Sequence, residues 1–405
     1  MAPSDQPRAS RADWAGRLRR LVPPLALAAL GVFAAPALGA WGLVAQWLLV
    51  AVFLGWLGMR LGGAWRNASV SLVSIVLVLA VVEAAAIATS RTEPAHSITT
   101  PGLNVTDPAL GWTLGAPGRY RERRVSGRDG RTIFDAAYTV DAARNRAVAA
   151  APAGPLVAFA GDSITFGTGV NDAETMPQAF ADATGRRLRV INLGVAGHGP
   201  QQALRALETG AWDARLAGLA VFIYTTAPWH AERTSCRAGD MARAPRYEPA
   251  GEGMRLAGTC GDAWWKPLFA RIERTATWQT ILRPALGGPS RAEVDFYIAT
   301  LSRIGELVRA KFAAPTVIQM IAAEGNYLER AGVTEAEIMA RLRAGGVSAI
   351  DASLDPAEFP GQVLRIPGDG HPTGLAHRLR AERLAAELAR LPELAALFAP
   401  ATPRP

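Results

Sequence analysis

Cysteine and histidine are scarce in this chain, which has two cysteines and five histidines among 405 residues. So few cysteines exclude a small fold held together by several disulfides. No cysteine and histidine stand at a zinc-ligand spacing, so the sequence predicts no metal site. Cys236 and Cys260 fall in one irregular stretch, and outside the cytoplasm such a pair can persist as a disulfide. Two unbonded core thiols are the alternative.

A concentrated basic surface is also missing, although the net charge is +8. Half of this surplus lies before residue 91, and the rest is spread over the remainder of the chain. The runs from Arg121 to Arg124 and from Arg186 to Arg189 are short and accompany no nucleic-acid motif. Nucleic acid is therefore not expected as a partner. Lysine supplies only two of the 43 basic residues, which we attribute to genome composition.

Apolar residues are in excess, and the excess lies between Leu21 and Ser90. A bilayer core needs about 20 apolar residues per helix. Three stretches have that length: Leu21 to Ala40, Trp41 to Met59 and Val70 to Thr89. They are too long and too numerous for a cleaved signal peptide. We expect residues 1–90 to form a cytoplasmic N-terminus and three transmembrane helices.

The arginines predict the orientation of these spans, because cytoplasmic loops carry an excess of basic residues. Five arginines precede the first span, and Arg60 and Arg66 lie between the second and the third. Both regions should therefore face the cytoplasm. This places everything after Ser90 outside, as the periplasmic part of a multi-pass protein of the cytoplasmic (inner) membrane. We interpret Glu83, inside the third span, as a carboxyl group near the outer interface, protonated or paired with Arg91.

Residues 91–150 are expected to hold a linker, up to Pro108, and a small β-element. Tyr120 to Val125 and Thr132 to Val140 read as strands, and Asp129-Gly130 marks a tight turn between them.

Residues 151–405 alternate short apolar strands with amphipathic helices. The expected strands are Leu156 to Ala160, Leu188 to Leu193, Leu219 to Thr225, Pro315 to Ile321 and Val347 to Asp351. Helices are expected at about Glu174 to Ala183, from Gln201, from Ser290 to Phe312, from Thr334 and from Gly374 to Leu391. This alternation predicts an α/β fold, a doubly wound parallel sheet in an α/β/α sandwich. An irregular insert at 231–289 interrupts it.

Chemically useful residues follow several of these strands. Ser163 follows the first strand, a glycine-rich turn from Asn192 to Gly199 follows the second, and Asp369 and His371 precede the last helix. The carboxyl ends of parallel strands meet at one edge of the sheet, so these residues should lie together. A serine needs a histidine to remove its proton, and the histidine needs a carboxylate to fix its tautomer. The set predicts acyl transfer through a serine nucleophile.

These blocks resemble the SGNH/GDSL hydrolase family, over roughly Pro155 to Leu391. The resemblance is carried by Gly161-Asp162-Ser163 with Phe166-Gly167, by Asn192-Leu-Gly-Val-Ala-Gly197, and by Asp369-Gly-His371. It implies a flavodoxin-like fold, Ser163 as nucleophile, His371 as base and Asp369 as its orienting carboxylate. The N–H groups of Ser163 and Gly197 would form the oxyanion hole, and no cofactor is implied.

Two positions depart from the family pattern. Thr226 stands where the family usually supplies an oxyanion-hole asparagine, and the usual Asp-x-x-His is shortened to Asp369-x-His371. A threonine hydroxyl can donate a hydrogen bond, but it is shorter than an amide. His198 and His230 lie near the expected site and could contact substrate, or serve only the structure.

The sequence thus predicts a membrane-anchored serine ester hydrolase acting on O-acyl esters of envelope polysaccharide or of lipid. The expected partner is an acylated small molecule, polysaccharide or lipid. Two alternatives stay open: an O-acyltransferase using the same triad, and a non-catalytic, membrane-tethered protein of the same fold that binds or assembles glycans. The sequence does not predict an oligomeric state.

Overall fold

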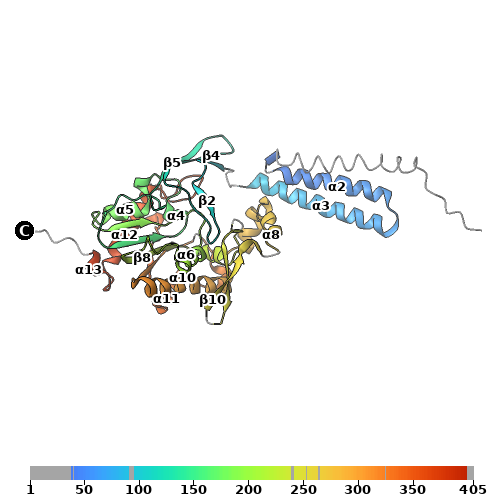
Figure 1. Ribbon diagram of the computed structural model, residues 1–405. Coiled ribbons are helices and arrows are strands. Elements are labelled where there is room, and N and C mark those ends of the chain that lie inside the picture. The colour runs from blue at the N-terminus through green and yellow to red at the C-terminus, as the bar shows by residue number, and fades with distance from the viewer. Residues whose placement is uncertain are drawn as a thin grey trace, which may run out of the picture. The chain divides into compact units, whose positions relative to one another are not determined.

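The computed structural model describes residues 38–39, 41–90, 95–238, 241–251, 253–262, 265–323 and 325–398. The chain divides into two compact units. The first unit is Met1–Thr92 with Arg271–Leu286, and the second is Glu93–Ala270 with Gly287–Pro405 (Figure 1). The chain therefore passes between the units three times.

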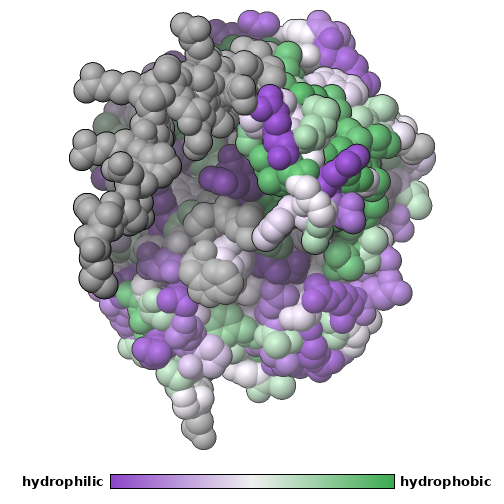
Figure 2. Space-filling view, turned by 90° about the vertical axis from the view of Figure 1, so that its right-hand side faces the viewer, coloured by the Kyte–Doolittle hydropathy of each residue, from purple (hydrophilic) through white to green (hydrophobic). Residues whose placement is uncertain are grey.

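Two helices of the first unit, α2 (Gly42–Arg60) and α3 (Gly63–Thr89), are long and apolar enough to cross a membrane. Small residues let them pack closely, since a side chain on Gly58 would meet Ser69, whose hydroxyl donates to the Leu54 carbonyl at 2.6 Å. Many other apolar side chains are exposed, including Val78 and Val81. Figure 2 shows a large green area of apolar residues at the upper right of the face that it draws, with smaller green areas elsewhere on that face.

These helices match the second and third predicted spans, with one difference. α3 begins seven residues before the predicted start at Val70, so Arg66 lies inside the helix rather than in a connection. The predicted first span, Leu21 to Ala40, lies outside the described residues except for residues 38–39. The described chain thus contains two helices that could span a membrane, and an anchor of three spans stays a prediction.

The second unit is built on a five-stranded sheet in the order β12-β11-β8-β6-β7. Its strands are β6 (Leu156–Ala160), β7 (Arg189–Asn192), β8 (Leu219–Thr226), β11 (Thr316–Met320) and β12 (Ser348–Asp351). All neighbouring pairs are parallel. Numbered along the chain, this is the 2-1-3-4-5 order of the flavodoxin-like doubly wound fold, whose order reverses between β6 and β8. The predicted fold class of this unit is confirmed.

Alternate residues of β6 pack on opposite faces of the sheet, as buried parallel strands require. Leu156, Ala158 and Ala160 contact one core and Val157 and Phe159 the other. The first core receives α6 (Pro200–Thr209), α10 (Arg291–Phe312) and α11 (Glu335–Ala344), and the second receives α5 (Met176–Ala183), α12 (Gly374–Leu388) and α13 (Ala395–Phe398). Figure 1 shows α5 and α12 on one side of the sheet, with α6, α10 and α11 on the other. The sheet is thus covered on both faces.

Helix starts follow capping signals in the sequence. The Ser290 hydroxyl accepts from the Glu293 N–H and the Glu293 carboxylate accepts from the Ser290 N–H, the capping box predicted there. The Thr334 hydroxyl accepts from the Glu337 N–H in the same way at α11. Short helical turns occur at Asp172–Glu174, Glu329–Ala331 and Pro356–Glu358.

A β-element precedes the sheet. β4 (Gly118–Ser126) and β5 (Thr132–Val140) form the predicted hairpin. β1 (Ala95–Thr99) pairs with β4, and β2 (Asn104–Asp107) pairs with β3 (Gly111–Leu114). The predicted linker up to Pro108 is therefore corrected, because two short strands occupy part of it. Their side chains are mostly polar and exposed, so they lack the apolar alternation that signals a strand.

The insert after β8 is more regular than the sequence predicts. It contains α7 (His230–Thr234), the hairpin of β9 (Pro245–Ala250) and β10 (Gly253–Thr259), a turn at Cys260–Asp262, and α8 (Lys266–Ile272). A π-helical turn, Trp278–Leu282, and α9 (Arg283–Leu286) follow. The sequence does not predict this hairpin, because the stretch is rich in glycine, proline and charged residues.

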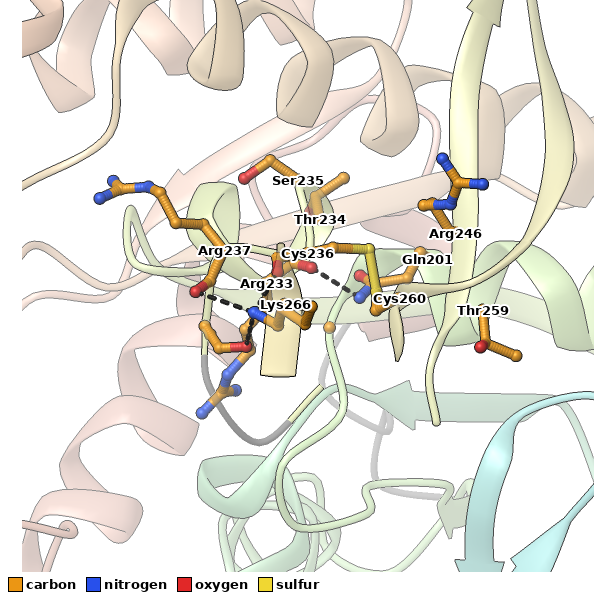
Figure 3. The surroundings of a disulfide bond; sticks show 12 residues. Gln201, Arg233, Thr234, Ser235, Cys236, Arg237, Arg246, Thr259, Cys260 and Lys266 are labelled. Atoms are coloured by element: carbon orange, nitrogen blue, oxygen red, sulfur yellow. Dashed lines mark hydrogen bonds between the residues drawn. A yellow bond between two sulfur atoms is a disulfide. The ribbon is translucent and has the colours of Figure 1, made fainter. Parts of the chain in front are cut away.

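Cys236 and Cys260 form a disulfide, as the first of the two sequence interpretations expects. It joins the segment after α7 to the end of β10, and Figure 3 shows the buried amine of Lys266 beside it. That amine donates to the backbone carbonyls of Cys236, Arg237 and Ala238. The start of α8 is thereby held against the disulfide.

Candidate active site

Ser163 is the first residue of a single helical turn, α4 (Ser163–Phe166), directly after β6. The carboxylate of Asp162 caps this turn by accepting from the Ile164 N–H at 3.0 Å. The strand thus ends at the edge where ligands bind in sheets of this kind, and the serine stands at the start of the helix that leaves it.

Ser163, His371 and Asp369 form a hydrogen-bonded chain. Nε2 of His371 lies 2.9 Å from Oγ of Ser163, and Nδ1 of His371 lies 2.5 Å from Oδ1 of Asp369. The N–H of His371 also donates to Oδ1 of Asp369 at 3.1 Å. A loop before α12 brings both residues to the serine, which is 208 positions from His371 in sequence. The distances suit proton transfer from a serine to a histidine that a carboxylate orients.

Asp369 has a second partner, which the sequence did not identify. Nε of Arg124, on β4, lies 3.1 Å from Oδ2 of Asp369, and the aspartate side chain is only 2% exposed. Burial alone would raise the pKa of Asp369, but the hydrogen bonds and charge of His371, together with the charge of Arg124, hold it below its ordinary value. The carboxylate is therefore ionised at neutral pH.

The glycine-rich turn after β7 packs directly against the serine turn. The amide of Asn192 donates to the Thr165 carbonyl at 2.8 Å, and the Val195 N–H donates to the Gly161 carbonyl at 3.2 Å. Gly194 permits this approach, since a Cβ there would collide with the backbone nitrogen of Phe166. Gly194 therefore allows the glycine-rich turn to pack against the serine turn.

Gly197 lies further along this turn with φ at +82°, a conformation that other residues rarely adopt. Within the described part of the chain, the N–H groups of Ser163 and Gly197 make no hydrogen bond. Backbone donors that are not already used are what an oxyanion hole requires.

The Thr226 hydroxyl, at the end of β8, lies inside a buried network. Its Oγ1 lies 2.9 Å from Nδ1 of His230 and 2.8 Å from the hydroxyl of Tyr297. Nε2 of His230 lies 3.0 Å from Oδ2 of Asp162. The network therefore ends on the carboxylate next to the candidate nucleophile.

Charge fixes the direction of these hydrogen bonds. Burial lowers the pKa of His230, although Asp162 opposes the shift, so the ring is neutral. Burial alone would raise the pKa of Asp162, but His230 and Arg233 outweigh it and lower this pKa strongly. The ionised carboxylate accepts from Nε2–H of His230 and from Arg233 at 2.7 Å. Nδ1 of His230 is then an acceptor, and the hydroxyl proton of Thr226 points to it.

His198 is tied to Trp112 on β3. Its Nε2 lies 2.9 Å from the Trp112 carbonyl, and the Trp112 indole N–H donates to the Ala196 carbonyl at 3.0 Å. Burial lowers the pKa of His198 to about 4, so the neutral ring donates to the carbonyl at neutral pH. The pair holds the turn that carries Gly197.

The structure therefore brings together most of the residues selected from the sequence. Ser163, Asp369 and His371 are in hydrogen-bond contact, and the turn carrying Gly197 lies against the serine turn. Thr226, His198 and His230 are buried and bonded to protein groups, and their predicted roles toward substrate stay predictions. No set of three potential metal ligands occurs among the residues that the structure describes.

Sequence reasoning missed Arg124 and Trp112, both from the β-element. In the sequence, Arg124 belongs only to a short basic run, and Trp112 is part of no motif. Their roles depend on how the β-element packs on the sheet, for which neither spacing nor composition gives a signal.

No family model matches the chain, and no curated protein matches it. Solved structures do match at low similarity. A lipolytic protein of the G-D-S-L family from Veillonella parvula is 17% identical and matches 59% of this chain and 100% of its own, with a TM-score of 0.35. An acetyl xylan esterase from Butyrivibrio proteoclasticus is 12% identical, with 64% of this chain and 68% of its own covered and a TM-score of 0.35. AlinE4, an SGNH-hydrolase family esterase, is 17% identical, with 62% of this chain and 100% of its own covered and a TM-score of 0.32.

Proposed function

We propose that this chain is a serine ester hydrolase of the SGNH/GDSL type that works through an acyl-enzyme. One observation carries the proposal: Oγ of Ser163 lies 2.9 Å from Nε2 of His371, whose Nδ1 lies 2.5 Å from Asp369. A serine in this setting has a base within reach, and the base has its tautomer fixed.

The reaction would run in two halves. Nε2 of His371 takes the proton from Ser163 as Oγ attacks the ester carbonyl, and Asp369 stabilises the resulting imidazolium. The N–H groups of Ser163 and Gly197 bind the oxyanion of the tetrahedral intermediate. His371 then protonates the leaving alcohol. In the second half His371 deprotonates a water, which attacks the acyl-serine; His371 then returns this proton to Oγ of Ser163 as the acid is released.

The proposal includes a location outside the cytoplasm. α2 and α3 have the length and composition of membrane spans, and the arginines before and between the predicted spans favour a cytoplasmic N-terminus. The disulfide between Cys236 and Cys260 fits an oxidising compartment. An anchored enzyme in that place would meet O-acyl esters of envelope polysaccharide or of lipid, and this substrate class rests on location alone.

Hydrolysis of short-chain chromogenic esters by the full chain in detergent tests the proposal. We expect wild-type activity and loss of nearly all of it in Ser163→Ala. Ser348→Ala is the matched control, because Ser348 begins β12 at the opposite end of the parallel strands. A serine-directed fluorophosphonate should label the wild type and the control but not Ser163→Ala.

Each other outcome has a defined meaning. A folded wild-type chain with neither turnover nor labelling contradicts the catalytic proposal and favours a binding role. Labelling with acylated sugar formed in preference to free acid indicates O-acyl transfer by the same triad.

A further inference from the structure

One segment of the insert belongs to the same compact unit as α2 and α3. This segment, residues 271–286, comprises the end of α8, the π-helical turn and α9. It lies nearly 200 positions after α3 in sequence, and its bonds to α3 span 193 and 194 positions. We call it the returning segment.

The bonds to α3 are made by the carboxylate of Glu83. Its Oε1 accepts from the Ala276 N–H at 2.8 Å, and its Oε2 accepts from the Thr277 N–H at 2.9 Å and from the Thr277 hydroxyl at 2.6 Å. Glu83 is 2% exposed. Three donors from the returning segment thus stabilise the Glu83 carboxylate inside an apolar helix. An unpaired carboxylate in that position would be costly in free energy. The expected partner, Arg91, lies outside the described residues.

The position of Glu83 fixes the depth of the returning segment along α3. Glu83 is six residues before the end of the helix at Thr89, which is about 9 Å at 1.5 Å per residue. A bilayer has a hydrocarbon core of about 30 Å and headgroup regions on either side. If α3 leaves the bilayer at its Thr89 end, residues 276–277 lie at the boundary between hydrocarbon and headgroups.

The side chains of the returning segment suit that boundary. Four apolar ones are exposed on this unit: Ile272, Ile281, Leu282 and Leu286. Trp278 is half-buried, and Arg271 is exposed. Apolar side chains with tryptophan and arginine are typical of chain that lies in a membrane interface. In water, these apolar side chains would be exposed beside an already apolar helix pair.

We propose that the returning segment is a second membrane contact, with the bilayer interface as its partner and Glu83 as the group that holds it there. This rests on the membrane anchoring included in the proposed function. The catalytic unit is then tied to the membrane by both sides of its insert as well as by the end of α3.

Spin labels on single introduced cysteines test the depth. The full chain is reconstituted in vesicles of phosphatidylcholine and phosphatidylglycerol, and the native cysteines are already paired in the disulfide. Labels go on Ile281→Cys, on Val78→Cys in α3 as the lipid reference, and on Val363→Cys, an exposed site of the catalytic unit. Collision with oxygen reports lipid exposure, and collision with a water-soluble nickel chelate reports water exposure.

We expect the labels at 281 and 78 to favour oxygen and the label at 363 to favour the chelate. A label at 281 in water with the label at 78 in lipid overturns this inference and leaves the anchor intact. Labels at 281 and 78 both in water overturn the inference together with the anchor. Ester hydrolysis, measured on the same samples, reports separately on the catalytic proposal.

The role of Glu83 is tested by Glu83→Ala in the Ile281→Cys background. We expect chelate collision at 281 to rise several-fold. Ser74→Ala is the control on the same helix, because the Ser74 hydroxyl donates to the Val70 carbonyl within α3. Unchanged collision in Glu83→Ala would show that Glu83 does not hold the segment. Retained ester hydrolysis in the variant shows that the catalytic unit stays folded.

Discussion

The guanidinium Nε of Arg124 lies 3.1 Å from Oδ2 of Asp369, so a strand outside the doubly wound sheet supplies a counter-charge to the candidate triad. The other oxygen of Asp369 is occupied by His371. The aspartate is thus held from two sides, by a loop of the doubly wound unit and by the β-element before it. We regard Arg124 as a positioning residue that acts through Asp369.

Replacing Arg124 by alanine should lower kcat by about tenfold with little change in KM, because Asp369 orients the base and does not bind substrate. Loss of the positive charge also raises the pKa of Asp369. Since the ionised carboxylate is the active form, the acid limb of the kcat/KM profile should move to higher pH. Arg123→Ala on the same strand is the control, because Arg123 bonds to Thr132 instead. An unshifted acid limb would contradict this role.

The Thr226→Val variant tests whether the Thr226 hydroxyl donates to the oxyanion or only supports the structure. Loss of an oxyanion donor costs roughly 100-fold to 1000-fold in kcat. We expect kcat to fall by less than about tenfold in Thr226→Val, because the hydroxyl proton is directed at His230. The free energy of unfolding should fall by about 1–3 kcal/mol, since His230 and Tyr297 each lose a buried partner. The adjacent Thr225→Val, which removes a buried bond to Gln319, is the control for stability. A loss of activity of 100-fold or more would restore Thr226 to the oxyanion hole.

His377→Leu should stabilise the protein and flatten its response to acid. The His377 ring on α12 is fully buried, and both ring nitrogens lack a hydrogen-bond partner among the described residues. Burial, with help from the charges of Arg380, His371 and Arg146, lowers its pKa from 6.5 to about 3. Between these values the unfolded chain binds a proton that the folded chain does not, so stability falls as pH falls through this window.

Thermal unfolding across that pH range measures the effect of His377→Leu. We expect a gain of about 1–3 kcal/mol at neutral pH, since the variant removes an unpaired buried polar group. The gap to the wild type should widen as the pH falls from 6.5. His96→Leu, at an exposed position of β1, should show neither change. A constant difference in stability between variant and wild type across this pH range would mean that the pKa of His377 is not lowered in the folded state.

The disulfide should stabilise the insert through the 24-residue separation that it closes. Replacing both Cys236 and Cys260 by alanine is expected to cost about 3 kcal/mol on the chain-entropy account. Reductant should lower the unfolding temperature of the wild type and leave that of the double variant unchanged. Equal unfolding temperatures for the wild type with and without reductant would rule out this contribution.

The doubly wound fold was predictable because its strands are buried on both faces. Leu156 to Ala160 reads as an unbroken apolar run, and it is β6 within the predicted limits. The hairpin of β9 and β10 was not predictable in this way, since every residue of β10 is exposed or half-buried and the strand carries no apolar run. Helix starts were predictable where a capping residue precedes the helix, as at Ser290.

The residues of the candidate site likewise fall into those that the sequence predicts and those that it does not. Ser163, Asp369 and His371 are found by residue type and by their places after strands or before a helix. Arg124 and Trp112 are ordinary residues of a polar β-element, and what they touch is decided by packing over a long sequence separation. His230 is a candidate in the sequence because of its place after β8, but its bond to Asp162 depends on burial that the sequence does not display.

The side chain of Arg146 is completely buried between the β-element and the sheet. Its Nε pairs with Asp172 at 2.8 Å, and its guanidinium donates to the carbonyls of Phe166 and Val170. Its carbon Cζ lies 4.3 Å from the ring centre of Tyr138 in β5. Asp172, its counter-ion, lies 26 residues later in the chain, beyond the first strand of the sheet. A fragment that begins at residue 151 would lack this buried cation and leave Asp172 and the two carbonyls without it, so we expect such a fragment to be less stable than the whole unit.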